Sequence, residues 1–178
     1  MNLKKAFYFL AIVGITLLCS FGLPSKLKKK VLKEVTKTFS VKEVTLEAVL
    51  IDISVENKLH KAIGKDHLFK IMKDEQLIGY AYVDKAPSKT DEFDYLILLD
   101  ANLVIAKAKV LVYREDYGGE IGSRRWLKQF IGKKSNDQLK YERDVIAISG
   151  ATISALSMTK AVNSFLKNVT ILKENSIL

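Results

Sequence analysis

The sequence predicts an α+β fold, in which a curved antiparallel sheet has helices packed on one side and is preceded by an N-terminal membrane helix. Three observations predict it. Short apolar segments separated by turn residues indicate β-hairpins between residues 68 and 113. Apolar residues recur at helical spacing over residues 27–39 and again after residue 151. Residues 6–23 form an apolar run without a charge, which is typical of a membrane segment.

The apolar run reads AFYFLAIVGITLLCSFGL and follows Lys4 and Lys5. Eighteen helical residues span about 27 Å, close to the roughly 30 Å hydrocarbon core of a bilayer. We therefore interpret residues 1–24 as an uncleaved membrane anchor, with a cleaved export signal and a lipoprotein modified at Cys19 as alternatives. Cys19 is the one cysteine of the chain, so neither an intrachain disulfide nor a cysteine-based metal site is expected.

The net charge of +9 is concentrated at the N-terminus. Residues 1–40 hold eight lysines and one acidic residue, whereas residues 41–178 hold 21 basic and 19 acidic residues. An excess of positive charge beside an apolar run is typical of binding to anionic lipid headgroups and argues against nucleic acid as the partner. Five lysines lie between residues 26 and 33, just after the run, and two precede it, so the positive-inside tendency would place the body in the cytoplasm.

Residues 25–40 are predicted to form an amphipathic helical linker, and residues 41–178 the globular domain. Leu27, Val31, Val35 and Phe39 recur at four-residue spacing with lysines between them. This helix is expected either to pack on the body or to lie at the lipid surface. For residues 45–53 the periodicity does not decide between helix and strand.

Two hairpins are predicted in the body. Residues 68–72 and 77–83 form the first, in which Gly79 suggests a bulge or a close approach of the backbone. After a loop over residues 86–92, residues 93–99 and 103–113 form the second. In its last strand, lysines at 107 and 109 alternate with apolar residues, so one face of the sheet is expected to face water.

The C-terminal part is predicted to contain a helix near residues 123–130, a strand over 145–148 and a last helix over 151–167. The sequence Ser149-Gly150-Ala151-Thr152 stands at the expected junction of strand and helix. Gly150 allows a sharp turn. Thr152 and Ser154 bring hydroxyls to the first helical turn, where free N–H groups and the helix dipole attract anions. These residues alone fit either a phosphate site or an ordinary helix cap formed by Ser149 or Thr152.

ISGATIS, together with GGEIGSRRWLKQFIGK upstream, resembles the FMN-binding domain family over about residues 65–168. This family includes the G subunit of the Rnf electron-transport complex and the C subunit of the sodium-translocating NADH:quinone oxidoreductase. The resemblance implies that a flavin transferase attaches FMN as a phosphoester to Thr152. The other cofactor-binding residues that it implies are Ser149, Gly150, Ala151, Ser154, Gly119, Glu120 and Trp126. The family's usual aspartate three residues before the serine is Ile146 here, and the nearest aspartate is Asp144.

The resemblance further implies a membrane-tethered flavoprotein, bound to the cytoplasmic membrane by a single span, that transfers electrons outside the cytoplasm. Its expected partners are the flavin transferase, the membrane, and redox proteins or a quinone-linked complex, with no nucleic acid and no metal. Trp126, Tyr113 and Tyr117 are candidates to stack on the flavin ring, although a core position is the favoured interpretation of Trp126. Two other functions stay open: a tethered binding module without flavin, and a reductase with noncovalent FMN.

Overall fold

The computed structural model describes residues 22–178 and confirms an α+β fold with an antiparallel sheet. Five strands pair in the order β1-β2-β3-β4-β5. They are β1 (Thr45–Ala48), β2 (Leu68–Lys73), β3 (Gln76–Pro87), β4 (Glu92–Asp100) and β5 (Ile105–Val112). The helices are α2 (Ser25–Phe39), α3 (Ile53–Glu56), η1 (Gly119–Gly122), α4 (Arg124–Leu127), η2 (Lys128–Phe130) and α5 (Thr152–Glu174).

The expected membrane segment, residues 1–24, lies almost entirely outside the described residues. From residue 22 onward, the helices are too short or too polar to cross a bilayer.

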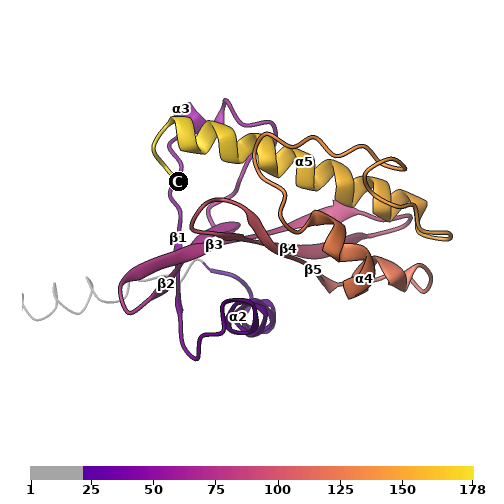
Figure 1. Cartoon of the computed structure of the whole chain (residues 1–178), viewed down its shortest axis with the longest axis horizontal. Coiled ribbons are helices and arrows are strands. Elements are labelled where there is room, and N and C mark those ends of the chain that lie inside the picture. The colour runs from indigo at the N-terminus through magenta and orange to yellow at the C-terminus, as the bar shows by residue number, and fades with distance from the viewer. Residues whose placement is uncertain (1–21) are drawn as a thin grey trace, which may run out of the picture.

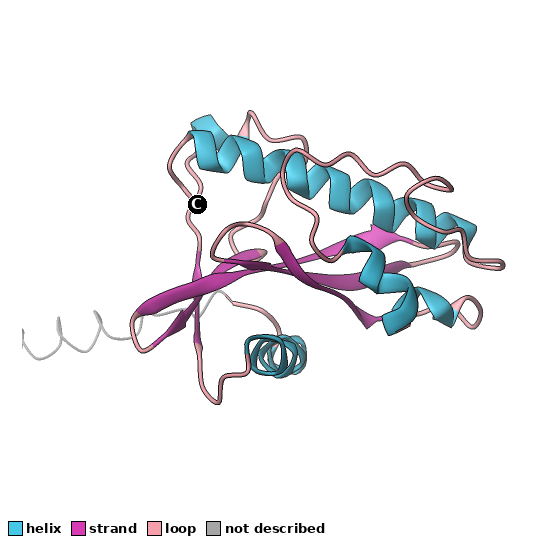
Figure 2. Ribbon diagram, viewed as in Figure 1, coloured by secondary structure: helices cyan, strands magenta, loops and turns pink. Residues whose placement is uncertain are grey.

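Helices cover both faces of the sheet, with α5 on one side and α2 on the other (Figures 1 and 2). The expectation of helices on one side and water on the other is therefore wrong. The reason lies in β4, where every residue from Phe93 to Leu99 is buried. Such a continuous buried run belongs to a strand that is covered on both faces, not to one with a solvated face.

Helix α2 packs on the sheet, which decides between the two alternatives for this segment. Val31 and Val35 are fully buried against a cluster that includes Leu96 and Leu98 of β4. Next to these buried valines, the Lys30 Nζ of α2 donates a hydrogen bond to the Leu111 carbonyl oxygen of β5 at 2.7 Å. The apolar side of α2 is thus used inside the protein, and its lysines remain at the surface.

Both predicted hairpins are confirmed, as β2–β3 and β4–β5. The ladder is irregular beside Gly79, where the register shifts. A Cβ atom added there would lie 2.3 Å from the Leu99 carbonyl oxygen, so the close backbone approach is confirmed as well. Residues 45–53 divide into strand β1 and the start of helix α3, and the loop expected over 86–92 shortens to residues 88–91.

The core on the α5 side is built around aromatic packing between β3 and the helix. The rings of Tyr82 and Phe165 stack with centroids 4.0 Å apart and planes 2° from parallel. Helix α5 extends beyond the predicted end at residue 167 because Val169 and Leu172 continue the buried stripe. The side-chain amide oxygen of Asn168 accepts a hydrogen bond from the His60 N–H at 2.8 Å and so fixes the loop between α3 and β2 to the helix.

A buried carboxylate, Asp84, joins this core to the loop before β2. The Tyr82 hydroxyl donates to it at 2.7 Å and the Tyr95 hydroxyl at 3.3 Å, while Lys61 and His67 reach it from the loop. Burial raises the pKa of Asp84, but hydrogen bonds from His67, Lys61 and Tyr82 outweigh burial and lower the pKa below its usual range. Burial also raises the pKa of Tyr82 and of Tyr95.

Because the pKa of Asp84 is lower in the folded state, its charge stabilises the fold fully above the unfolded pKa of about 3.9. This stabilisation is lost progressively as the pH falls from there toward the lower pKa of the folded state. We expect Asp84→Asn to lower the free energy of unfolding at neutral pH by about 1–3 kcal/mol. Urea unfolding should show this difference shrinking toward a pH of about 3. Exposed Asp116→Asn is the control. A loss that is equal at both pH values would contradict the expectation.

Candidate functional site

The candidate site begins at the N-terminus of α5. The helix starts at Thr152, the preceding Ala151 occupies the N-cap position, and no side chain caps the helix. The ordinary cap by Ser149 or Thr152 is therefore not formed. The N–H of Ala155 bonds to the Ala151 carbonyl oxygen at 2.9 Å and that of Ala151 to the Ile148 carbonyl oxygen at 3.1 Å. The N–H groups of Thr152, Ile153 and Ser154, in the first turn of the helix, have no backbone acceptor within residues 22–178. These free donors and the helix dipole make the start of α5 favourable for an anion.

The loop before the motif is held by side chains. The strand expected over residues 145–148 is not formed, because Val145 makes only an isolated bridge with Tyr141. Instead, the Trp126 Nε1 donates to the Ile146 carbonyl oxygen at 2.7 Å, and the Ile146 N–H donates to the Gln129 Oε1 at 2.8 Å. The motif consequently lies at a junction of loop and helix, positioned by the segment that contains Trp126.

The glycine-rich turn upstream packs directly on the motif. Gly118 has a φ of 76°, and a Cβ atom added to it would lie 2.5 Å from the Ala151 Cβ and 3.1 Å from the Gly150 carbonyl oxygen. Ala151 is itself buried. The two sequence blocks that suggested the site thus meet in space, and their contact requires a residue without a side chain at 118.

A pocket of about 410 Å³ lies beside Thr152, within the usual range of about 300–1,000 Å³ for small-molecule sites. Its lining residues are Lys89, Tyr113, Glu115, Tyr117, Gly150, Ala151, Thr152, Ile153 and Ser154. The Thr152 side chain is exposed. Tyr117 is 82% exposed and Ile153 50% exposed. Such exposed apolar surface next to a polar helix terminus suits a ligand with a flat apolar ring and an anionic group.

Ser154 is used within the protein. It is buried, and its Oγ lies 3.0 Å from the Tyr113 hydroxyl. The Tyr113 ring in turn forms a T-shaped pair with Phe93, with centroids 6.0 Å apart. Ser154 therefore positions Tyr113 as a wall of the pocket.

Glu115 fixes the β3–β4 loop against the pocket. Its two carboxylate oxygens accept from the Thr90 N–H at 2.7 Å and from the Thr90 hydroxyl at 2.9 Å. Hydrogen bonding to the Ser88 side chain and to the Thr90 backbone lowers the pKa of Glu115 to about 2. Glu115 is thus anionic at neutral pH, holds the loop and brings Lys89 to the pocket. The sequence did not indicate Lys89, because this pairing joins segments that no local pattern connects.

A second pocket, of about 580 Å³, is lined in part by residues 146–149, directly before Gly150. Three predicted residues line it: Ser149, Glu120 and Trp126. Thr152, Gly150, Ala151 and Ser154 line the first pocket, and Gly119 lines neither. The Trp126 ring is 6% exposed and packs edge-on against Phe130 at 5.3 Å. This placement agrees with the favoured interpretation of Trp126 as a core residue.

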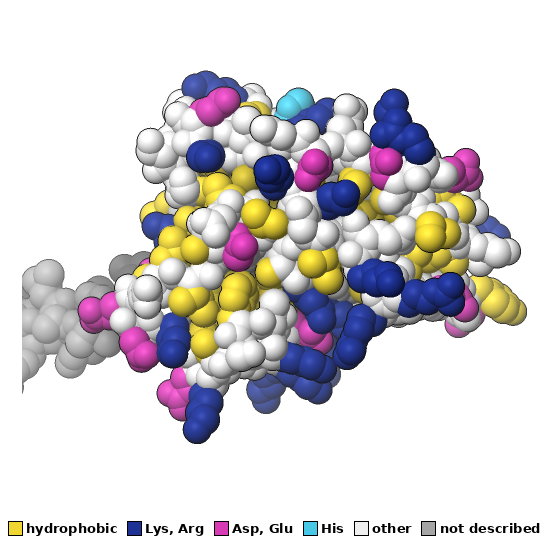
Figure 3. Space-filling model, viewed as in Figure 1, with side chains coloured by type: hydrophobic (Ala, Val, Ile, Leu, Met, Phe, Trp, Pro, Cys, Tyr) yellow, Lys and Arg dark blue, Asp and Glu magenta, His cyan; other side chains and the backbone are white. Residues whose placement is uncertain are grey.

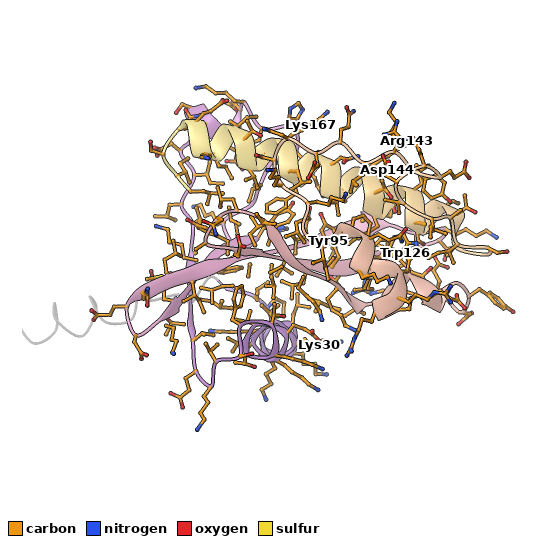
Figure 4. All side chains as sticks on the ribbon, in the orientation of Figure 1. Lys30, Tyr95, Trp126, Arg143, Asp144 and Lys167 are labelled. Carbon is orange, nitrogen blue, oxygen red and sulfur yellow. The ribbon has the colours of Figure 1, made fainter. Side chains whose placement is uncertain are left out.

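Asp144 is the aspartate nearest to the position where the family has aspartate, and its carboxylate forms local hydrogen bonds within residues 140–144. It accepts from the Arg143 guanidinium and from the Lys140 N–H, each at 2.8 Å, and the two side chains lie together in Figure 4. The hydrogen bond from Arg143, followed by that from Lys140, lowers the pKa of Asp144 to about 2. Ile146, at the family's usual aspartate position, is exposed and lines the second pocket.

Gly150 has a φ of 76°, and a Cβ atom added to it would meet no atom within 4 Å. A side chain here would strain the backbone but crowd nothing in the protein. We expect Gly150→Ala to lower the free energy of unfolding by about 1–2 kcal/mol, measured by urea unfolding. Gly119→Ala is the matched control, since its added Cβ is also uncrowded and its φ is not positive. Equal stability of the two variants would show that Gly150 is not needed for the turn.

A comparison with known protein families finds a match in the segment that forms the site. Residues 89–167 match the model of the FMN-binding domain. The matched segment begins at Lys89, includes the Gly118 turn and Trp126, and ends inside α5. No curated protein matches the chain. The resemblance drawn from the two motifs is therefore confirmed, and over residues 89–167 this chain matches the FMN-binding domain family.

Proposed function

We propose that the protein is a membrane-tethered flavoprotein that carries FMN as a phosphoester on Thr152 and transfers electrons outside the cytoplasm. One observation carries the proposal. Thr152 presents an exposed hydroxyl at the uncapped first turn of α5, beside a pocket, within a segment that matches the FMN-binding domain.

The residues present fit FMN at both of its ends. A phosphate on the Thr152 oxygen would lie in the field of the helix dipole, near the free N–H groups of the first turn. The Lys89 side chain lines the same pocket and would add a positive charge. Tyr117 and Ile153 offer exposed apolar surface for the ring system. FMN itself supplies the one- or two-electron chemistry, and these residues bind and orient it.

The exposed positions of Thr152 and Tyr117 suit electron transfer to a partner protein. A covalent bond would keep the cofactor in place on the outer side of a membrane, where released FMN would not be replaced. The redox partners are expected to be proteins of a membrane complex or a quinone-linked system.

Three functions give different results in one experiment. The full chain is produced together with a flavin transferase, purified, denatured in SDS and separated on a gel. Flavin fluorescence in the protein band supports covalent FMN. Flavin that separates from the band would instead support a noncovalent reductase. A protein without any flavin would support the tethered binding module and contradict the proposal.

The proposed location predicts the orientation of the C-terminus. A reporter that is active only after export, fused after Leu178, should be active, and a cytoplasmic reporter at the same point should be silent. The excess of lysines after residue 23 favours the opposite orientation, so the two expectations predict opposite reporter results. An active cytoplasmic reporter with a silent export reporter would refute the extracytoplasmic location.

A further inference from the structure

A strongly basic face runs along α2 and continues across the sheet to α4. Its exposed or half-exposed cations are Lys29, Lys33 and Lys37 on α2, Lys109 on β5, and Arg124 and Lys128 at α4 and η2. Lysine and arginine side chains gather along the lower edge of the molecule, from α2 toward α4 (Figure 3). We term these six residues the basic face.

The basic face is built by the fold, because its members come from three separate segments. Lys37, Lys109, Arg124 and Lys128 line one narrow groove of about 80 Å³. The groove contains one acidic residue, Glu34, whose carboxylate lies 3.9 Å from the Lys107 Nζ. Lys107 is the fifth cation that lines the groove. Within residues 22–178, the other four form no ion pair, so their charge is available to a partner.

Lys29 and Lys33 extend this charge along the helix. They precede Lys37 at four-residue spacing, which places the three side chains on one side of α2. Val31 and Val35, on the opposite side, are fully buried against the sheet. Helix α2 therefore cannot insert an apolar face into lipid, and what it offers to a surface is charge.

We propose that the basic face docks on the phosphate groups of anionic phospholipids and so sets the orientation of the domain at the membrane. The proposal rests on the membrane tether of the proposed function. Helix α2 begins at Ser25, directly after the apolar run that ends at residue 23, so this face lies close to the anchor in sequence. Clusters of lysine and arginine beside a membrane segment bind anionic lipid surfaces.

The composition of the face favours lipid over an acidic protein. Protein–protein interfaces are depleted in lysine and rely on buried aromatic or apolar anchors. Of the large apolar side chains that are exposed among residues 22–178, Ile131 is the one that lines the groove, at 47% exposure. A surface of five lysines and one arginine with a single exposed apolar side chain fits a diffuse layer of phosphate groups better than a shaped protein surface.

Trp126, the one tryptophan of the chain, provides a native reporter because it lies in α4 between Arg124 and Lys128. The full chain, made without flavin transferase, is reconstituted into nanodiscs whose phosphatidylcholine headgroups carry a TEMPO spin label. The discs contain phosphatidylcholine alone or with added phosphatidylglycerol. We expect stronger quenching of Trp126 fluorescence in the discs with phosphatidylglycerol, and loss of this difference in high salt.

Two triple variants with the same change in charge identify the surface. The test variant is Lys33→Glu, Lys37→Glu and Lys128→Glu. The control is Lys160→Glu, Lys167→Glu and Lys173→Glu, three exposed lysines of α5; Lys167 and Lys30 of α2 lie on opposite sides of the sheet in Figure 4. At about fivefold per lysine, the test variant should weaken the phosphatidylglycerol-dependent association by about 100-fold, and the control should leave it unchanged.

The outcomes distinguish a failure of the lipid-binding proposal from a failure of the membrane anchor. If the protein is not retained by phosphatidylcholine discs, the anchor is wrong, but the basic face still requires retention by phosphatidylglycerol discs at low salt. Equal quenching in both kinds of disc overturns the proposal, as expected if the face serves an acidic protein or nucleic acid. An equal loss of quenching in the test and control variants overturns it too, because association would then follow net charge alone.

Discussion

Thr152→Ala should abolish covalent flavin completely. The hydroxyl of Thr152 is the proposed point of attachment, and no other hydroxyl of the motif has its environment. Ser149 lines the second pocket, and Ser154 is buried against Tyr113. Neither serine is therefore expected to carry the phosphate in place of Thr152. The measurement is flavin fluorescence of the denatured band after production with the transferase, normalised to the amount of protein.

Two variants control for the fold and for the chemistry of the hydroxyl. Ser149→Ala removes an exposed hydroxyl of the same motif and should retain covalent flavin. Thr152→Ser keeps a hydroxyl at position 152 and should retain at least part of the modification. Because the Thr152 side chain is exposed at a helix start, Thr152→Ala should remain folded. Modification that persists in a folded Thr152→Ala protein would show that the attachment site is a different residue.

Gly118→Ala should have the largest effect among the glycine substitutions. The added Cβ would lie 2.5 Å from the Ala151 Cβ, at a backbone φ of 76°. The left-handed conformation costs about 1–2 kcal/mol for a residue with a side chain, and overpacking a buried contact costs about 1–3 kcal/mol more. We expect a loss of about 2–5 kcal/mol in the free energy of unfolding, together with strongly reduced flavin incorporation, since the motif would have to move.

Gly119→Ala is the matched control for this variant as well. The neighbouring position has an ordinary φ and open space around the added Cβ. Urea unfolding and in-gel fluorescence of the two variants should therefore differ clearly, with Gly119→Ala near the wild type in both. If Gly118→Ala matched Gly119→Ala in stability and flavin content, the packing of the glycine-rich turn on Ala151 would not be important for the site.

The elements with a clear local pattern were predictable from the sequence. Alternation and turn residues indicated both hairpins, and the four-residue spacing of Val31 and Val35 indicated α2. The sequence could not show that α2 lies on the opposite face of the sheet from α5, because an apolar stripe does not specify its partner. The expected solvated face was wrong for this reason, and Lys107 pairs with Glu34 of α2 instead of facing open water.

The site was predictable to the extent that its residues are adjacent in sequence. The tetrapeptide ending in Thr152 indicated a site at the start of α5. Lys89 could not be predicted as part of it, because Lys89 reaches the pocket only through the hydrogen bonds of Glu115 to Thr90. The strand expected at 145–148 failed because a short apolar run can be held by side chains as well as by a neighbouring strand. Here Trp126 and Gln129 hold it.

The most direct test of the central claim is the mass of the peptide that contains Thr152. The full chain is produced with and without a flavin transferase, digested, and analysed by mass spectrometry with fragmentation. We expect this peptide to gain the mass of FMN less one water only when the transferase is present, with fragmentation placing the added mass on Thr152. An unmodified peptide in the presence of an active transferase, or an added mass on another residue, would contradict it.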